Sequence, residues 1–279
     1  MSAQRHALDL ALLAPLVLLA LGPHVAHAQQ PATHGAEGCS VAPPVPGAPQ
    51  DGFALDVQLG FGVGSERWER PAADGTAQEL PDSAFAALDA GLRLRLPQTG
   101  RFALSTALRY RSSLGYRVEQ RPLFALPSEQ DVRVQRLELS ARAAWLAAAG
   151  AWRPTLGIEL AVALASFVPE LHDRLAPKYA LAGPVLRPFG ALEPVDWLSL
   201  ELGPELWWIA VVDGDLRDDG VRAQGFGLGA EAKARARVAP GFALELDFRS
   251  GVAFVDSRGD RVDFESAERF LTLGVVGEL

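Results

Sequence analysis

The chain has 279 residues, a formal net charge of −8 and a single cysteine. The negative charge argues against nucleic-acid binding, which normally needs a basic surface, and one cysteine excludes a disulfide framework or a multi-thiolate metal site. Hydrophobic residues make up 49% and charged residues 22% of the chain, a composition that excludes wholesale disorder.

The first 28 residues have the features of a secretory signal peptide. Arg5 supplies the positive charge, Leu10–Gly22 forms the apolar run, and Ala26–Ala28 provides a small-x-small cleavage site. The apolar run is too short for a transmembrane anchor, and Pro15 interrupts it. We therefore predict an exported protein from which residues 1–28 are removed.

Residues 29–50 are rich in Pro, Ala and Gly and lack hydrophobic periodicity, which predicts a flexible periplasmic tail. Cys39 lies in this tail, far behind the apolar run and in a sequence unlike a lipidation site, so we interpret it as an incidental thiol. The mature chain has no apolar run near 18 residues, which excludes a helical membrane protein.

From Phe53 to the C terminus, apolar and polar residues alternate with the period of a β-strand. Between Phe53 and Val63, for example, every odd-numbered residue is apolar. One segment, Val185–Glu193, is weaker because Pro188 interrupts it. The segments that show the pattern are Phe53–Val63, Ala84–Leu96, Arg101–Val118, Val132–Trp145, Thr155–Val168, Val185–Glu193, Trp197–Val211, Gln224–Val238, Phe242–Phe254 and Arg269–Leu279. We therefore predict ten strands.

Strand length and connection length both indicate a barrel in a bilayer. The segments reach or nearly reach the roughly 9–11 residues that a tilted strand needs to cross a membrane, whereas strands of soluble domains average about 5–6 residues. Short connections such as Pro97–Gly100 alternate with long ones such as Glu69–Ser83, Glu119–Asp131, Pro169–Pro184 and Val255–Glu268. Short turns on one side and long loops on the other are typical of outer-membrane barrels, and an even strand number places both termini on the periplasmic side.

Aromatic residues occur near the ends of the predicted strands, where a barrel meets the two membrane interfaces. The predicted membrane-interface aromatics are Phe53, Phe102, Trp145, Trp197 and Phe242 at the short-turn ends, and Trp68, Tyr116, Phe167, Trp208 and Phe254 at the long-loop ends.

This strand pattern resembles that of the small bacterial outer-membrane β-barrels of the OmpA-like superfamily of barrel domains. The resemblance implies an all-β fold, a transmembrane antiparallel up-and-down barrel of ten strands over residues 51–279, with short periplasmic turns and long extracellular loops. It also implies an outer-membrane location, contact with outer-membrane lipid and lipopolysaccharide, and folding by the barrel-assembly machinery. Barrels of this family usually end in an aromatic residue, whereas this chain ends in Leu279. We expect a monomer without a cofactor or nucleic-acid partner.

The polar face of each strand is expected to point into the lumen. Basic and acidic residues on this face nearly balance, which favours ion pairing because an isolated charge in a narrow lumen is costly. Barrels of about eight strands are filled by side chains, so ten strands favour a plugged interior. The predicted lumen charge network consists of Arg93, Arg95, Arg109, Arg111, Arg136, Glu138, Arg142, Glu159, Glu201, Glu205, Glu231, Lys233, Arg235, Glu245, Asp247 and Arg249.

The charges are also segregated along the chain. The second to fourth predicted strands are mainly basic on their polar face, and the fifth to seventh are mainly acidic. One interpretation is a narrow pore whose transverse field selects charged solutes. The other is pairing across the lumen that simply fills the interior, and we favour this second interpretation because the strand number is small.

Two loop segments carry residue types used in catalysis or metal binding. His172 and Asp173 in one predicted loop, with Asp213 and Asp215 in the next, could activate a water molecule. Omptin-type proteases are ten-stranded barrels that use Asp and His at the outer rim, but the residues around His172 match no motif that can be transferred. The acidic segment from Asp213 departs from calcium-loop spacing because Arg217 stands at position five. We predict no catalytic, cofactor or metal site.

The sequence therefore favours an outer-membrane barrel with a mostly closed, salt-bridged lumen, which acts as a structural or surface-interaction protein and is not an enzyme. A narrow charge-selective solute channel is the alternative hypothesis. An omptin-like surface hydrolase is the third.

Overall fold

The computed structural model describes residues 52–71, 77–120, 128–147, 152–169, 178–216, 223–256 and 264–279. The predicted signal peptide, the predicted tail with Cys39, and the His172-Asp173 pair lie outside the described residues.

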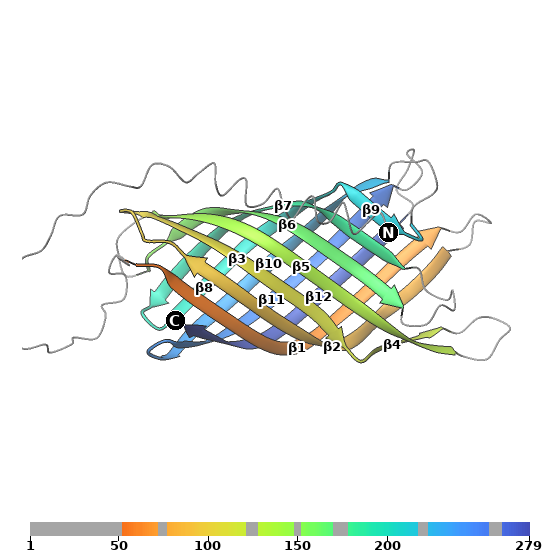
Figure 1. Ribbon diagram of the computed structural model, residues 1–279, viewed down its shortest axis with the longest axis horizontal. Helices are drawn as coiled ribbons and strands as arrows, with labels where there is room; N and C mark the ends of the chain where they lie inside the picture. The colour runs from red at the N-terminus through yellow and green to blue at the C-terminus, as the bar shows by residue number, and fades with distance from the viewer. Residues whose placement is uncertain are drawn as a thin grey trace, which may run out of the picture. The chain divides into compact units, whose positions relative to one another are not determined.

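The described residues form one closed antiparallel barrel (Figure 1). Within them, no helix is long and apolar enough to cross a membrane. The strands are β1 (Ala54–Pro71), β2 (Ala77–Arg95), β3 (Phe102–Leu114), β4 (Tyr116–Gln120), β5 (Ser128–Leu146), β6 (Thr155–Pro169), β7 (Tyr179–Val195), β8 (Leu198–Ile209), β9 (Val211–Gly214), β10 (Gln224–Ala239), β11 (Phe242–Asp256) and β12 (Phe264–Glu278). Neighbours follow the order β3-β2-β1-β12-β11-β10-β8-β7-β6-β5, and pairing of β3 with β5 closes the ring.

Two of the barrel strands are interrupted, so the barrel has ten strands. β3 and β4 both pair with β5 and are separated at Gly115, whose φ of 61° is a left-handed conformation that glycine adopts without strain. β8 and β9 both pair with β7 and are separated at Ala210. The predicted ten-stranded antiparallel barrel is confirmed.

Several strands extend into segments predicted as loops. β2 begins at Ala77, β7 at Tyr179 and β12 at Phe264, each several residues earlier than predicted. In the extensions of β7 and β12 the large apolar side chains are buried and point inward, as at Tyr179, Leu181 and Phe264. The prediction from sequence places apolar residues on the outer face of each strand. It therefore misses a segment in which the apolar residues point inward.

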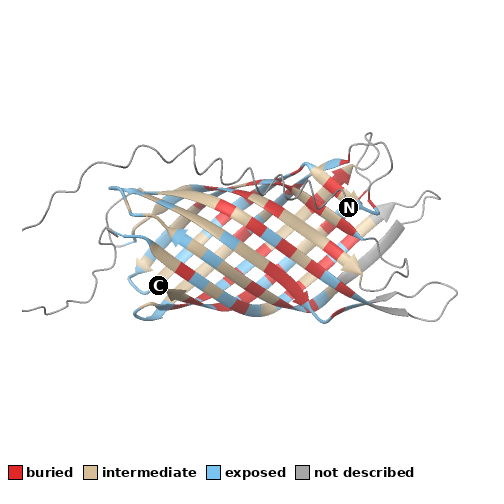
Figure 2. Ribbon diagram, in the orientation of Figure 1, coloured by how far each residue is buried: buried red, intermediate tan, exposed pale blue. Residues whose placement is uncertain are grey.

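Exposure alternates along much of the described strands, and Figure 2 shows the result as a chequered pattern of buried and exposed residues. One set of side chains points out of the barrel and the other points into its interior. The outward set contains many large hydrophobic residues that are exposed, which we call the apolar belt. It includes Leu59, Phe61, Leu104, Leu160, Leu202, Leu228, Phe248 and Leu273.

The interior has two different halves. We call the end of the barrel that holds Ala54 and Glu278 the terminal rim, and the other end the distal rim. Towards the distal rim the interior is filled by a buried apolar cluster that we call the apolar plug. It includes Trp68, Phe85, Tyr116, Val134, Phe167, Tyr179, Leu181, Trp207, Ile209, Phe264 and Phe270.

The prediction that Trp68, Tyr116 and Phe167 face the membrane interface is wrong, because all three are at most 2% exposed and belong to the apolar plug. Trp68 and Phe167 lie an even number of residues from the inward Asp56 and Glu159, so they share their face of the strand. Leu114 is exposed, so unbroken alternation would also place Tyr116 on the outer face. The left-handed turn at Gly115 breaks the alternation, and Tyr116 therefore points inward. The other seven predicted interface aromatics face outward, namely Phe53, Phe102, Trp145, Trp197, Trp208, Phe242 and Phe254.

Glycines opposite the inward rings provide the space that these rings occupy. A Cβ atom at Gly64 would lie 2.4 Å from the Phe85 ring, and one at Gly157 would lie 2.2 Å from the Phe189 ring. Phe85 and Phe189 are therefore each matched by a missing side chain on the neighbouring strand, which makes room for the ring.

Candidate functional site

The interior of the barrel holds the predicted charged residues, and half of them lie in two ionic clusters. The first, which we call the β3 cluster, joins Arg109 and Arg111 of β3 to Asp89, Glu231 and Asp247. Arg109 Nη1 donates to Glu231 Oε1 at 2.8 Å, and Arg111 Nη2 donates to Asp247 Oδ2 at 2.7 Å. Arg109 also binds Asp89, with its Nε 2.8 Å from Oδ1. Three carboxylates from three strands thus surround two guanidinium groups.

The second cluster, which we call the Glu138 cluster, is built around two carboxylates that each bind three arginines. Glu138 accepts hydrogen bonds from Arg136 at 2.6 Å, from Arg187 at 2.7 Å and from Arg249 at 2.8 Å. Glu205 accepts from Arg136 at 3.0 Å, from Arg187 at 2.8 Å and from Arg249. Charge-assisted bonds of this kind are stronger than neutral ones and fix the side chains in one arrangement.

Some of these ion pairs cross the full width of the barrel. Arg249 stands on β11 and Glu138 on β5, and these strands are five positions apart around the ring in either direction when each interrupted strand counts once. The same holds for Arg109 on β3 and Glu231 on β10. Since the paired atoms are only 2.8 Å apart in both cases, the side chains meet across the centre of the lumen.

The central charges are removed from water. Asp89, Asp247 and Arg249 are at most 1% exposed, and Arg111 and Arg136 are also buried. Burying an ion costs several kcal/mol unless opposite charges and hydrogen bonds compensate for the lost hydration. The near balance of basic and acidic residues predicted from the sequence appears here as direct pairing.

Further ion pairs lie towards the terminal rim. Arg142 binds Glu201 through two hydrogen bonds of 2.8 and 2.6 Å, and its guanidinium carbon lies 3.6 Å from the centre of the Phe189 ring. Arg95 and Arg235 both contact Asp56 and Glu278, at distances between 2.8 and 3.4 Å.

The remaining predicted lumen residues also face the interior. Glu159 accepts a hydrogen bond from Arg187 at 2.7 Å, Lys233 lies 3.1 Å from Glu231, and Glu245 accepts from Gln58 at 3.1 Å. Arg93 lines an internal cavity together with Lys233, Arg235 and Glu245. The structure therefore brings the predicted lumen residues together in the barrel interior.

Two small cavities adjoin the Glu138 cluster in the described interior. The first, of about 40 Å³, contains Arg93 and Lys233 in its lining and lies on the terminal side of the Glu138 cluster. The second, of about 30 Å³, is lined by Glu66, Tyr179 and Trp207 among others and borders the apolar plug. A buried water needs roughly 10–15 Å³ of such volume, so each cavity has room for a few water molecules.

Sequence reasoning missed a buried polar network near the distal rim. Tyr179 Oη and Ser266 Oγ donate hydrogen bonds to Glu66 at 2.8 and 2.6 Å. Glu268, also missed, accepts from Arg136 at 2.7 Å. These residues lie outside the predicted strands. The inward orientation of Glu66 could nevertheless have been predicted, because Glu66 lies an even number of residues from the inward Asp56.

Of the residues considered for catalysis, Asp215 has a structural contact. Its Oδ2 accepts a hydrogen bond from the backbone N–H of Lys178 at 2.8 Å, which ties the end of β9 to the start of β7. In the described part of the chain, no group of three or more His, Cys, Asp and Glu side chains is placed to hold a metal ion.

No protein-family model matches the chain, and no curated protein matches it in sequence. Among solved structures, the chain is similar to the outer membrane protease OmpT from Escherichia coli, with a TM-score of 0.42 and 12% identity over 82% of this chain and 97% of that chain. It is also similar to Neisserial surface protein A, with a TM-score of 0.32 and 12% identity over 81% and 96% of the two chains. The attachment invasion locus protein Ail of Yersinia pestis has a TM-score of 0.32 and 10% identity over 81% and 99% of the two chains. Identities this low say nothing of a shared activity.

Proposed function

We propose that the protein is an outer-membrane β-barrel with a closed, salt-bridged lumen that acts as a structural or surface-interaction protein. The observation that carries the proposal is the set of buried ion pairs that join opposite strands across the lumen, such as Arg249 with Glu138 and Arg109 with Glu231.

The apolar belt supports placement in a membrane. Long rows of outward Leu, Val and Phe surround the barrel, and soluble monomers rarely expose continuous apolar surface of this extent. The uninterrupted strands have 15–19 residues, more than the roughly 9–11 that a tilted strand needs to cross a bilayer. Exposed aromatics at the terminal rim, such as Phe53, Trp197 and Phe242, fit one membrane interface.

The packing of the interior supports a closed lumen. The two cavities beside the Glu138 cluster measure about 40 and 30 Å³, and residues of that cluster line both of them. Beyond the clusters, the apolar plug fills the distal half with buried rings. The basic and acidic residues that are segregated along the sequence meet as ion pairs in the lumen. The channel alternative requires a transverse field across open water, and this arrangement does not support it.

We expect the refolded protein to insert into planar lipid bilayers without discrete conductance steps, because the ion pairs and the apolar plug occupy the lumen. Single-channel recording checks this, with the heat-dependent shift of the folded barrel on a gel as the control for folding. Ion-selective steps from folded protein would overturn the closed-lumen proposal and favour the narrow channel.

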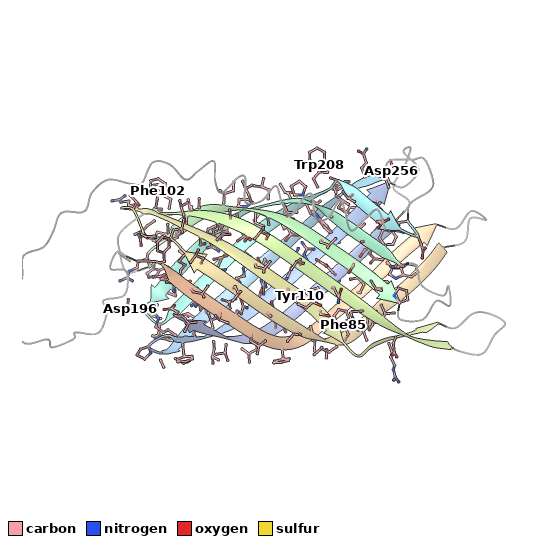
Figure 3. The ribbon with its side chains drawn as sticks, viewed as in Figure 1. Phe85, Phe102, Tyr110, Asp196, Trp208 and Asp256 are labelled. Carbon is pink, nitrogen blue, oxygen red and sulfur yellow. The ribbon has the colours of Figure 1, made fainter. Side chains whose placement is uncertain are left out.

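Two adjacent tryptophans test membrane placement and the direction of the side chains. Trp207 is 6% exposed and points inward, whereas Trp208 is 65% exposed and projects away from the barrel wall (Figure 3). In vesicles of brominated lipid we expect W208F to lose a clear part of the quenchable tryptophan fluorescence, and W207F to lose none. Equal loss in both variants, or no quenching in the unaltered protein, would contradict the outward apolar surface as a lipid contact.

A further inference from the structure

In the described wall of the barrel, the seam between β7 and β8 is interrupted. Leu186 lies opposite Leu206 and Gly190 lies opposite Leu202, but no ladder pair is formed between them. The register on both sides of this gap is the same, so Pro188 lies opposite Pro204. By comparison, the β10–β11 seam pairs every residue from Gln224 to Arg237 without a gap.

The direction of the backbone groups explains the gap. Ala210 N donates to the carbonyl of Ala182, so the backbone groups of Ala182 face β8 and β9. In a strand these groups alternate sides, and therefore those of Pro184 and Pro188 face β8 too. Arg237 N donates to the carbonyl of Trp197, which faces β10, so the even-numbered Pro204 faces β7.

The prolines remove the donors that this seam needs. A regular antiparallel pair at this position would exchange two N–H···O bonds, but proline has no N–H, so Pro188 and Pro204 present two carbonyls and no donor. Pro184, opposite Trp208, removes a third donor nearby. All three prolines are exposed on the outer face of the barrel, where the proposed bilayer offers no replacement donor.

Side chains hold the seam on its inner face. Arg187 and Glu205 lie directly opposite one another beside the proline pair, and Arg187 Nε donates to Glu205 Oε2 at 2.8 Å with both residues buried. Phe189 also approaches β8, since a Cβ atom at Gly203 would lie 3.1 Å from the Phe189 Cβ atom, whereas the Phe189 ring lies against Gly157 of β6. A buried side-chain ion pair thus joins the two strands where backbone hydrogen bonds are missing.

We propose that the β7–β8 seam is a lateral gate, the place where the barrel wall opens between lumen and bilayer, with the Arg187–Glu205 pair as its latch. The gate goes beyond the proposed closed-lumen role, because it concerns the wall of the barrel and not passage along its axis. Between Leu186 and Gly190, opening here breaks buried ion pairs of the Glu138 cluster but no backbone ladder pair, whereas opening the β10–β11 seam breaks a continuous ladder at every level.

Residue-resolved amide hydrogen exchange of the refolded protein in micelles tests the gate. The amides of Leu186, Gly190, Leu202 and Leu206 should exchange about tenfold faster than those of Ala232 and Phe248, which face each other in the β10–β11 seam, because two net hydrogen bonds are missing beside them. Equal protection of the two sets would overturn the proposal.

Variants separate the prolines from other causes of local exchange. The double variant P188L/P204L restores both donors and should slow the four seam amides to the rate of the β10–β11 amides. P194L, in the same strand but outside the gap, is the matched control and should leave them fast. E205Q should increase exchange at the seam relative to the β10–β11 amides. Fast seam exchange that P188L/P204L leaves unaltered would also overturn the proposal, and the comparison within the unaltered protein stands even where a variant fails to fold.

Discussion

Replacing Glu138 by glutamine is expected to lower the free energy of unfolding by about 3–5 kcal/mol, the usual cost of removing one partner from a buried ion pair. Glu138 accepts hydrogen bonds from Arg136, Arg187 and Arg249, and all three arginines are buried. Glutamine keeps nearly the same volume, so the loss reports the missing charge and not a cavity. Urea unfolding of the barrel in lipid vesicles measures the change.

The matched control is an ion pair of similar length on the outside of the barrel. Arg117 Nε lies 2.9 Å from Asp131, but their side chains are 67% and 51% exposed. Exposed pairs contribute about 0–1 kcal/mol, so D131N should have little effect. If E138Q unfolds at the same urea concentration as the unaltered protein, the ion pairs of the lumen do not stabilise the barrel.

The second large effect is expected from the apolar plug. Phe270 is 3% exposed, packs edge-on against Phe85 with ring centres 5.8 Å apart, and lies 5.7 Å from the Arg111 guanidinium. F270A should lower the free energy of unfolding by about 3–5 kcal/mol, because the lost ring leaves a cavity between buried neighbours. The same urea titration measures it.

Phe248 provides the control for this truncation. It belongs to the apolar belt and is 44% exposed, so lipid chains can fill the space that a smaller side chain leaves. F248A should therefore cost clearly less than F270A. If F248A lowers the free energy of unfolding more than F270A does, the inner and outer faces of the barrel wall have been assigned incorrectly. The assignment of residues to the lumen would then also be wrong.

Much of the barrel follows from the period of the sequence. The alternation from Phe53 onward predicts the strand number and, within each strand, which residues share a face. The residues of the predicted lumen charge network, among them Arg109, Glu138 and Arg249, consequently lie in the interior. The ends of the strands were predicted less well, because near the distal rim the apolar residues, such as Tyr179 and Leu181, point inward.

The predicted interface aromatics show that position near a strand end is not enough to predict which face of the barrel wall a residue occupies. Trp68 and Phe167 lie near strand ends, and this position alone predicts a membrane interface. Both lie an even number of residues from an inward charged residue, and this spacing would have placed them in the lumen. Tyr116 could not be placed by parity, because it depends on a local left-handed turn at Gly115. A single break of this kind reverses the face of every residue that follows it.

The sequence by itself determined that the chain alternates into ten strands with a charged inner face, since a period of two is a local property of extended backbone. Only the tertiary structure decided which charges meet, because Arg249 and Glu138 are brought together by closure of the ring and not by proximity along the chain. The same holds for the seam: Pro188 and Pro204 are visible in the sequence, but their opposition depends on the register between β7 and β8. Register and closure are properties of pairs of strands, which no single strand specifies.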